Sequence, residues 1–188
     1  TFTNNDGTVL LSSAYDQDLE FDGTGNMHHL TINKSDNDVI HNSDLTIEGD
    51  LSITLATAHT FRPNTGSRTL SVTGDVTIVE GKLGDITNYT GAISFGSLTI
   101  ESGGTYSATS GTTTFATADT HRAGYGGQPS AIEVKSGGTF THNNGTVNFT
   151  SAYDQDIEMD GTGTLYNFTI NKSDNDVIHE IEIIKYPI

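Results

Sequence analysis

The chain has 188 residues, of which 33% are hydrophobic and 17% are charged, and it contains no Cys and no Trp. Its 24 Asp and Glu residues outnumber its 8 Lys and Arg residues, which gives a net charge of −16 at pH 7. An acidic chain of this kind is repelled by phosphate backbones and anionic lipid surfaces. No apolar stretch approaches the length of a membrane span. We therefore expect no nucleic-acid partner and no insertion into a membrane.

Short β-strands are predicted along the whole chain, and each is written as an apolar, polar, apolar triplet. In chain order the clearest triplets are Leu30–Ile32, Leu45–Ile47, Leu70–Val72, Leu98–Ile100, Ile132–Val134 and Phe168–Ile170. Alternation with a period of two and β-branched side chains is typical of strands. Clusters of Gly, Asn and Asp separate the triplets and favour turns. No window shows apolar residues at helical spacing, so the sequence predicts an all-β fold.

The chain also repeats itself, which restricts the kind of β fold. Residues 1–41 return as residues 139–179 with 29 of 41 positions identical, including the runs SAYDQD and TINKSDNDVIH. A shorter repeat lies within the long one, since Leu98–Tyr106 returns as Ile132–Phe140 at an offset of 34. Repetition at a fixed period is the signature of stacked structural units. The whole of residues 1–188 is therefore interpreted as one repetitive segment.

A period of about 34 residues predicts a right-handed parallel β-helix with coils of that length. Propeller blades are longer, whereas repeats of a β-sandwich remain the alternative fold. Leu45–Ile53 resembles Leu70–Ile78 at an offset of only 25, which leaves the number of coils at five or six. In-register coils bury equivalent residues together. The residues expected to be buried and stacked are Leu30, Ile32, Leu98, Ile100, Ile132, Val134, Phe168 and Ile170, with Leu70 in the same column as Leu30, Leu98, Ile132 and Phe168.

The stretch Ser136–Phe149, followed by Tyr166–Asn171, resembles the β-helix repeats of large bacterial surface proteins of the adhesin type and of phage virion structural and fibre proteins. This resemblance implies an extracellular, cell-surface or virion location and a structural or adhesive role without catalysis. It supplies no catalytic residues and no cofactor. The expected partners are neighbouring domains or subunits of the same assembly, and surface glycans. The first copy begins in the middle of a repeat unit, so we expect the sequence to be a fragment of a longer chain. We also expect its two end coils to need a neighbouring domain or subunit that covers their exposed strand edges.

Acidic turns are the candidate metal ligands. Carboxylates two residues apart beside turns supply the oxygen ligands that calcium prefers. The candidate residues are Asp16, Asp18 and Asp22 with their copies Asp154, Asp156 and Asp160. Asp is also common in turns for backbone reasons alone, and no complete calcium-binding motif is present. A calcium-like cation at these turns is thus one interpretation, and ordinary solvated turns are the other.

A carbohydrate-active enzyme, either a polysaccharide lyase or a hydrolase, is the alternative function. Paired carboxylates can hydrolyse glycosides when they face one another across a few ångströms. The duplicated Asp sets, however, stand four predicted coils apart, or about 19 Å at the spacing of strands in a sheet. The basic residues that a lyase needs are scattered along the chain. The sequence therefore favours a non-enzymatic protein.

Overall fold

The computed structural model describes residues 4–21, 26–84, 89–116, 130–152, 155–173 and 177–180, and these residues form β-strands and turns without any helix. The strands are β1 (Thr8–Leu11), β2 (Gln17–Leu19), β3 (His29–Lys34), β4 (Val39–His41), β5 (Leu45–Ile47), β6 (Leu51–Leu55), β7 (Thr60–Pro63), β8 (Leu70–Val72), β9 (Asp75–Leu83), β10 (Ile93–Phe95), β11 (Ser97–Ile100), β12 (Gly104–Ser107), β13 (Thr112–Phe115), β14 (Ile132–Val134), β15 (Thr139–Thr141), β16 (Thr146–Phe149), β17 (Gln155–Met159), β18 (Thr162–Gly163), β19 (Asn167–Ile170) and β20 (Val177–Glu180).

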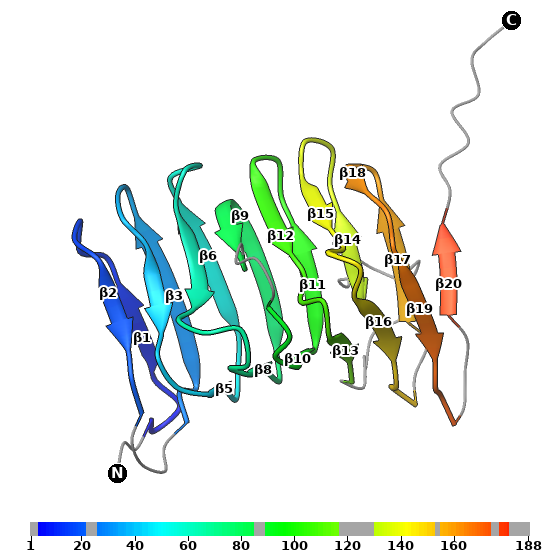
Figure 1. Ribbon diagram of the computed structural model, residues 1–188, viewed down its shortest axis with the longest axis horizontal. Coiled ribbons are helices and arrows are strands. Elements are labelled where there is room, and N and C mark those ends of the chain that lie inside the picture. The colour runs from blue at the N-terminus through cyan, green and yellow to red at the C-terminus, as the bar shows by residue number, and fades with distance from the viewer. Residues whose placement is uncertain are drawn as a thin grey trace, which may run out of the picture.

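The strands stack into three parallel sheets that run the length of a rod (Figure 1). Sheet A has the order β1-β3-β6-β9-β11-β14-β17-β20, and sheet C has the order β5-β8-β10-β13-β16-β19. Sheet B joins β2, β4, β7, the second half of β9, β12, β15 and β18. Every described pairing between strands is parallel, so the fold is a β-solenoid of about six turns. This confirms the predicted all-β parallel architecture.

The predicted coil length is not confirmed. Leu30 pairs with Leu51 in the next coil and Leu51 pairs with Val76, so the coils in the first half of the rod are shorter than predicted. The predicted spacing occurs where Leu98 pairs with Ile132. The sequence period came from that one wide coil, whose length includes residues 117–129, which lie outside the described part of the chain.

The predicted core is confirmed in part. Leu30, Ile32, Leu98, Ile100, Ile132 and Val134 are fully buried in sheet A. Phe168 and Ile170, in contrast, are 43% and 56% exposed, and the prediction that they are buried is wrong. They belong to β19, the last strand of sheet C, so no described strand lies above them. Leu70 also belongs to sheet C, in register with Leu45 and Ile93, rather than to the column that holds Leu30.

The two copies of the long repeat occupy different sheets. In the first copy β1 and β3 lie in sheet A and β2 and β4 in sheet B. Their counterparts in the second copy, β16 and β19, lie in sheet C, and β17 and β20 lie in sheet A. Because coil length varies, the stretch of chain from one copy to the other does not close a whole number of coils. The second copy therefore stands one sheet away from the first.

The interior is a continuous apolar column bounded by the three sheets. Aromatic rings line it on the sheet C side, where Phe115 stacks on Phe149 with ring centres 5.3 Å apart and meets Phe95 edge-on at 6.1 Å. Tyr106 is also fully buried, and its hydroxyl lies 2.9 Å from the hydroxyl of Thr113. A buried hydroxyl needs such a partner because an unsatisfied polar group in the interior is costly.

Candidate functional site

The two identical runs of the repeat meet at one corner of the coil. The Lys34 ammonium donates to the carbonyl of Tyr15 at 2.5 Å, to the carbonyl of Asp38 at 3.3 Å and to Oε1 of Gln17 at 3.4 Å. Asn37, whose backbone is left-handed with φ of 62°, donates its side-chain amide to the carbonyl of Ala14. The turn of one coil is thus fastened to the turn of the coil before it. The side chains that make these bonds, Lys34, Gln17 and Asn37, all lie within the two runs that the copies share.

One of these bonds is also present in the second copy. Lys172, the copy of Lys34, donates to Oε1 of Gln155 at 3.2 Å, and Gln155 is the copy of Gln17. In the first copy burial lowers the pKa of Lys34, while the carboxylates of Asp16, Asp38 and Asp36 oppose that shift. The corner therefore already holds a cation supplied by the chain itself. The carbonyls of Tyr15 and Asp38, which are oxygens of the kind that calcium selects, are occupied by this ammonium.

The predicted calcium ligands are not brought together in the part of the chain that the structure describes. Asp16 accepts the backbone N–H of Asp38 at 3.1 Å, whereas Asp18 and Asp160 are exposed and Asp156 is buried. Asp22 and Asp154 lie outside the described residues. Among the described residues no group of three or more His, Cys, Asp or Glu side chains could hold a metal ion. A calcium-like site at these turns stays a prediction.

Several Asp side chains instead fasten one coil to the next. Asp38 accepts the backbone N–H of Thr60 at 3.0 Å, and Asp44 accepts that of Thr69 at 2.9 Å. Asp50 accepts the N–H of Asp75 at 3.0 Å. Each bond provides an acceptor for a backbone N–H group at a corner between two sheets. These acidic side chains therefore contribute to the stacking of coils.

We expect Lys34→Met to lower the free energy of unfolding by about 1–3 kcal/mol, because it removes the donor from acceptors at a partly buried corner. The matched control is Lys172→Met, which changes the same motif next to β19, the last strand of sheet C. We expect it to lower the free energy of unfolding by less than Lys34→Met does. Urea denaturation followed by circular dichroism measures both. If Lys34→Met leaves the free energy of unfolding unchanged, the structural role assigned to Lys34 is wrong.

The outer face of sheet A carries a row of carboxylates that sequence reasoning missed. Glu133 lies in register between Thr99 and Glu158, and the Lys135 ammonium lies 2.7 Å from Glu101 and 4.0 Å from Glu133. Burial raises the pKa of Glu133, and the neighbouring carboxylates of Glu158 and Glu101 raise it further against the opposing effect of Lys135. Glu133 therefore keeps its proton to a higher pH than an ordinary Glu side chain.

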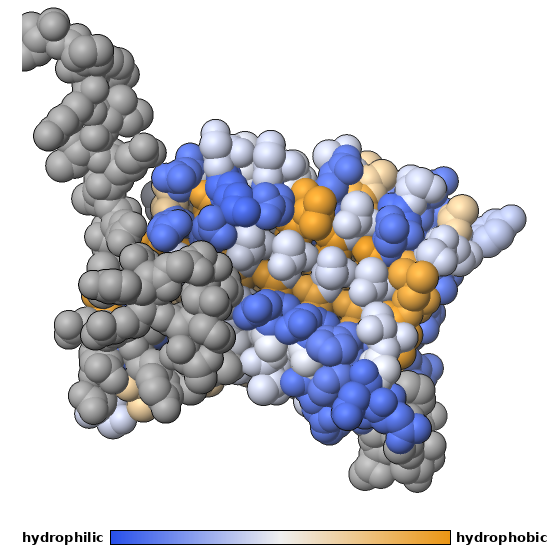
Figure 2. Space-filling model, turned by 180° about the vertical axis from the view of Figure 1, so that it is seen from behind, coloured by the Kyte–Doolittle hydropathy of each residue, from blue (hydrophilic) through white to orange (hydrophobic). Residues whose placement is uncertain are grey.

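In the earlier coils of sheet A, uncharged residues occupy the positions that correspond to Glu133. The residues in register there are Thr31, Ser52, Thr77 and Thr99. Figure 2, which views the rod from behind, shows a pale band of this character between more hydrophilic margins. The acidic residues Asp50 and Glu80 and the polar residue His29 lie beside the band, in the same strands or at their ends.

Sheet C presents a second outer surface, which we name the neutral face. It consists of the outward residues of β8, β10, β13, β16 and β19 together with the residue two positions before each of them: Thr69, Ser71, Ala92, Ser94, Thr112, Thr114, Thr146, Asn148, Asn167 and Thr169. None of the ten is charged, in a chain of which 17% is charged. The face ends before β5, where Asp44 and Glu48 flank Thr46. Its hydroxyls and amides can both donate and accept hydrogen bonds.

An exposed aromatic ring borders the neutral face. Tyr166 directly precedes β19 and is 60% exposed. Its ring stacks on His142 with centres 5.3 Å apart and planes inclined by 18°. Because one face of the Tyr166 ring is fixed against His142, a ligand that packs on the other face loses little side-chain entropy. No sequence pattern predicted the pairing, because the two residues belong to different coils.

Comparisons with protein-family models, with curated proteins and with solved structures return no match to this chain. Within the described ranges no helix is long and apolar enough to cross a membrane. The class of protein defined here is therefore the fold alone, a parallel β-solenoid. Its function has to be argued from the surfaces just described.

Proposed function

We propose that this chain is a non-enzymatic structural and adhesive segment of an extracellular protein, carried on a cell surface or a virion, and that its neutral face contacts uncharged glycans. The single observation that carries the proposal is the absence of charge over five successive strands of sheet C, at the ten described positions that form this face. The stacking of coils supports the structural part of the role, because a solenoid extends by adding units and exposes long flat surfaces.

The chemistry of the neutral face suits an uncharged sugar polymer. With a net charge of −16 the rod repels anionic polymers, but over this face a neutral ligand approaches without an electrostatic penalty. Thr114 and Asn148 occupy neighbouring strands in register, so their polar groups repeat along the rod at about 4.8 Å. Tyr166 adds an exposed ring at the border, where the apolar side of a sugar can pack.

The test is binding of immobilised neutral polysaccharides to single variants of the chain. We expect Tyr166→Ala and Thr114→Glu to weaken binding about tenfold, which corresponds to roughly 1.4 kcal/mol. The matched controls are Tyr15→Ala, which removes another exposed Tyr, and Thr77→Glu, which adds the same charge to the outer face of sheet A. Neutral polysaccharides that fail to bind, or four variants that bind alike, would refute the proposal.

A carbohydrate-active enzyme is the second candidate, and one observation favours it. Glu133 combines a raised pKa with a second carboxylate, Glu158, on the adjacent strand. A carboxyl group whose pKa is raised keeps its proton to a higher pH and is better suited to act as a general acid. If the chain releases reducing sugars, Glu133→Gln should abolish the release, whereas Glu20→Gln, at an exposed position, should leave it unchanged.

A further inference from the structure

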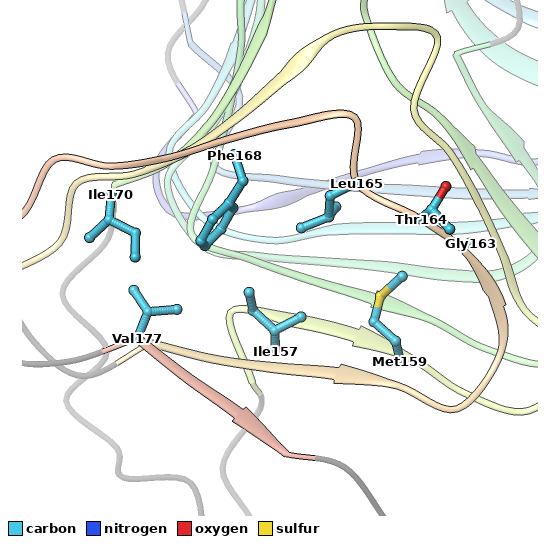
Figure 3. Close-up of a pocket in the computed structure, with 8 residues that line it drawn as sticks. All are labelled: Ile157, Met159, Gly163, Thr164, Leu165, Phe168, Ile170 and Val177. Carbon is cyan, nitrogen blue, oxygen red and sulfur yellow. The ribbon is translucent and has the colours of Figure 1, made fainter.

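The last described coil ends in an open apolar cavity of about 430 Å³. Figure 3 shows Leu165, Phe168 and Ile170 facing Met159, Ile157 and Val177 across it. Exposure of large apolar side chains is unusual unless a partner covers them, and Phe168 and Ile170 are about half exposed. The strands that surround the cavity also have a free edge, since β18, β19 and β20 each pair with a single neighbour among the described strands.

The first copy of the repeat shows what covers these side chains. There the equivalent residues lie beneath the next coil and are at most 1% exposed. The pairs in register are Met27 with Ile47, Leu30 with Leu51, Ile32 with Ile53 and Val39 with Phe61. All four covering residues belong to residues 42–63, so this one segment closes the surface of the first copy.

Each of these covered residues has its copy in the cavity. Leu165, Phe168, Ile170 and Val177 are the copies of Met27, Leu30, Ile32 and Val39, respectively. The correspondence does not depend on which sheet each copy occupies, because the order of strands along the chain is the same in both. The second copy therefore offers the surface on which residues 42–63 pack in the first.

We propose that the cavity end of the rod binds a β-coil with the residue pattern of residues 42–63. Its Leu51 and Ile53 equivalents would lie over Phe168 and Ile170, and its Phe61 equivalent over Val177. Backbone groups of the incoming coil would pair with the free edges of β19 and β20, as in other cases of strand addition. The chain has a net charge of −16 and residues 42–63 carry three acidic side chains against one Arg, so added salt should strengthen the contact by screening the repulsion between the two polypeptides.

The inference rests on the proposed role as a segment of a larger assembly, but its test uses no glycan, so the two can fail separately. The probe is a fluorescent peptide with the sequence of residues 42–63, titrated against the chain of residues 1–188 with anisotropy as the readout. Hydrogen exchange of the β19 backbone amides gives a second measurement. The matched control is the same peptide with Leu51→Asp and Ile53→Asp. Since only the peptide is altered, misfolding of the chain cannot mimic the result.

We expect saturable binding of the unaltered peptide, slower exchange in β19, and binding about tenfold weaker or more for the altered peptide. A chain shortened to residues 1–180 should bind the unaltered peptide equally well. No binding, or equal binding of both peptides, would overturn the inference. Binding by the shortened chain alone would also overturn it, since residues 181–188 would then be the occupant of the cavity.

Discussion

Phe115→Ala should lower the free energy of unfolding by about 3–5 kcal/mol, the range for removing a fully buried aromatic side chain. Phe115 has no exposed surface, stacks on Phe149 and meets Phe95 edge-on, so its loss leaves a void in the middle of the interior column. Such a loss is a large share of the roughly 5–15 kcal/mol that stabilises an ordinary domain. Chemical denaturation of the variant and of the unaltered chain measures the change in the free energy of unfolding.

Thr114→Ala is the matched control, because Thr114 is the preceding residue of the same strand and points outward. Its effect should stay within about 0.5 kcal/mol, as for other surface positions without special contacts. Should the two substitutions cost the same, the assignment of inward and outward residues in β13 would be wrong.

Gly96→Ala should cost about 1–3 kcal/mol, because three glycines stack where one coil passes from sheet C to sheet A. Gly74 donates its N–H to the carbonyl of Gly49, and Gly96 donates to the carbonyl of Gly74, each at 3.1 Å. A Cβ atom at Gly96 would collide with the carbonyl oxygens of Thr73 and Gly74. Since these are backbone atoms, the coils themselves would have to separate. Thermal unfolding measures the effect.

The control for that substitution is Gly7→Ala. Gly7 is exposed, and the nearest atom to an added Cβ is the carbonyl oxygen of Asn4 at 3.1 Å. Its melting temperature should remain close to that of the unaltered chain. A large loss at Gly7, or none at Gly96, would mean that close approach of the coils does not explain the glycines at this corner.

The sequence predicted the parallel stacking because period-two triplets and repetition are local signals. Leu30, Ile32 and Leu98 were correctly expected in the core, since each lies in a strand that both neighbours cover. Phe168 and Ile170 carry the same signal, but burial also requires a strand above them, and no local pattern encodes that. The predicted coil length was not confirmed for the rod as a whole, because a corner can lengthen without changing the strands on either side of it.

The candidate surfaces were harder to predict. The neutral face and the pair of Glu133 and Glu158 each combine residues from different coils, whose register follows from the individual coil lengths. The acidic turns, in contrast, stood out in the sequence, but the role that the structure gives to Asp16 and Asp38 is to accept N–H groups of the following coil. A conspicuous motif here reflects stacking, whereas the surfaces best suited to binding have no motif.

Because the two repeat copies differ in position by one sheet, a longer array of this unit would present its repeated surface features on different sides of the rod. Identical turns such as those at Lys34 and Lys172 would not form a line along one side of the filament, as they would if each repeat closed a whole number of turns. They would wind around it like the thread of a screw, returning to the same side after three repeats because there are three sheets. A ligand or antibody that recognises this turn would then decorate the filament on every side, whatever the direction from which it arrives.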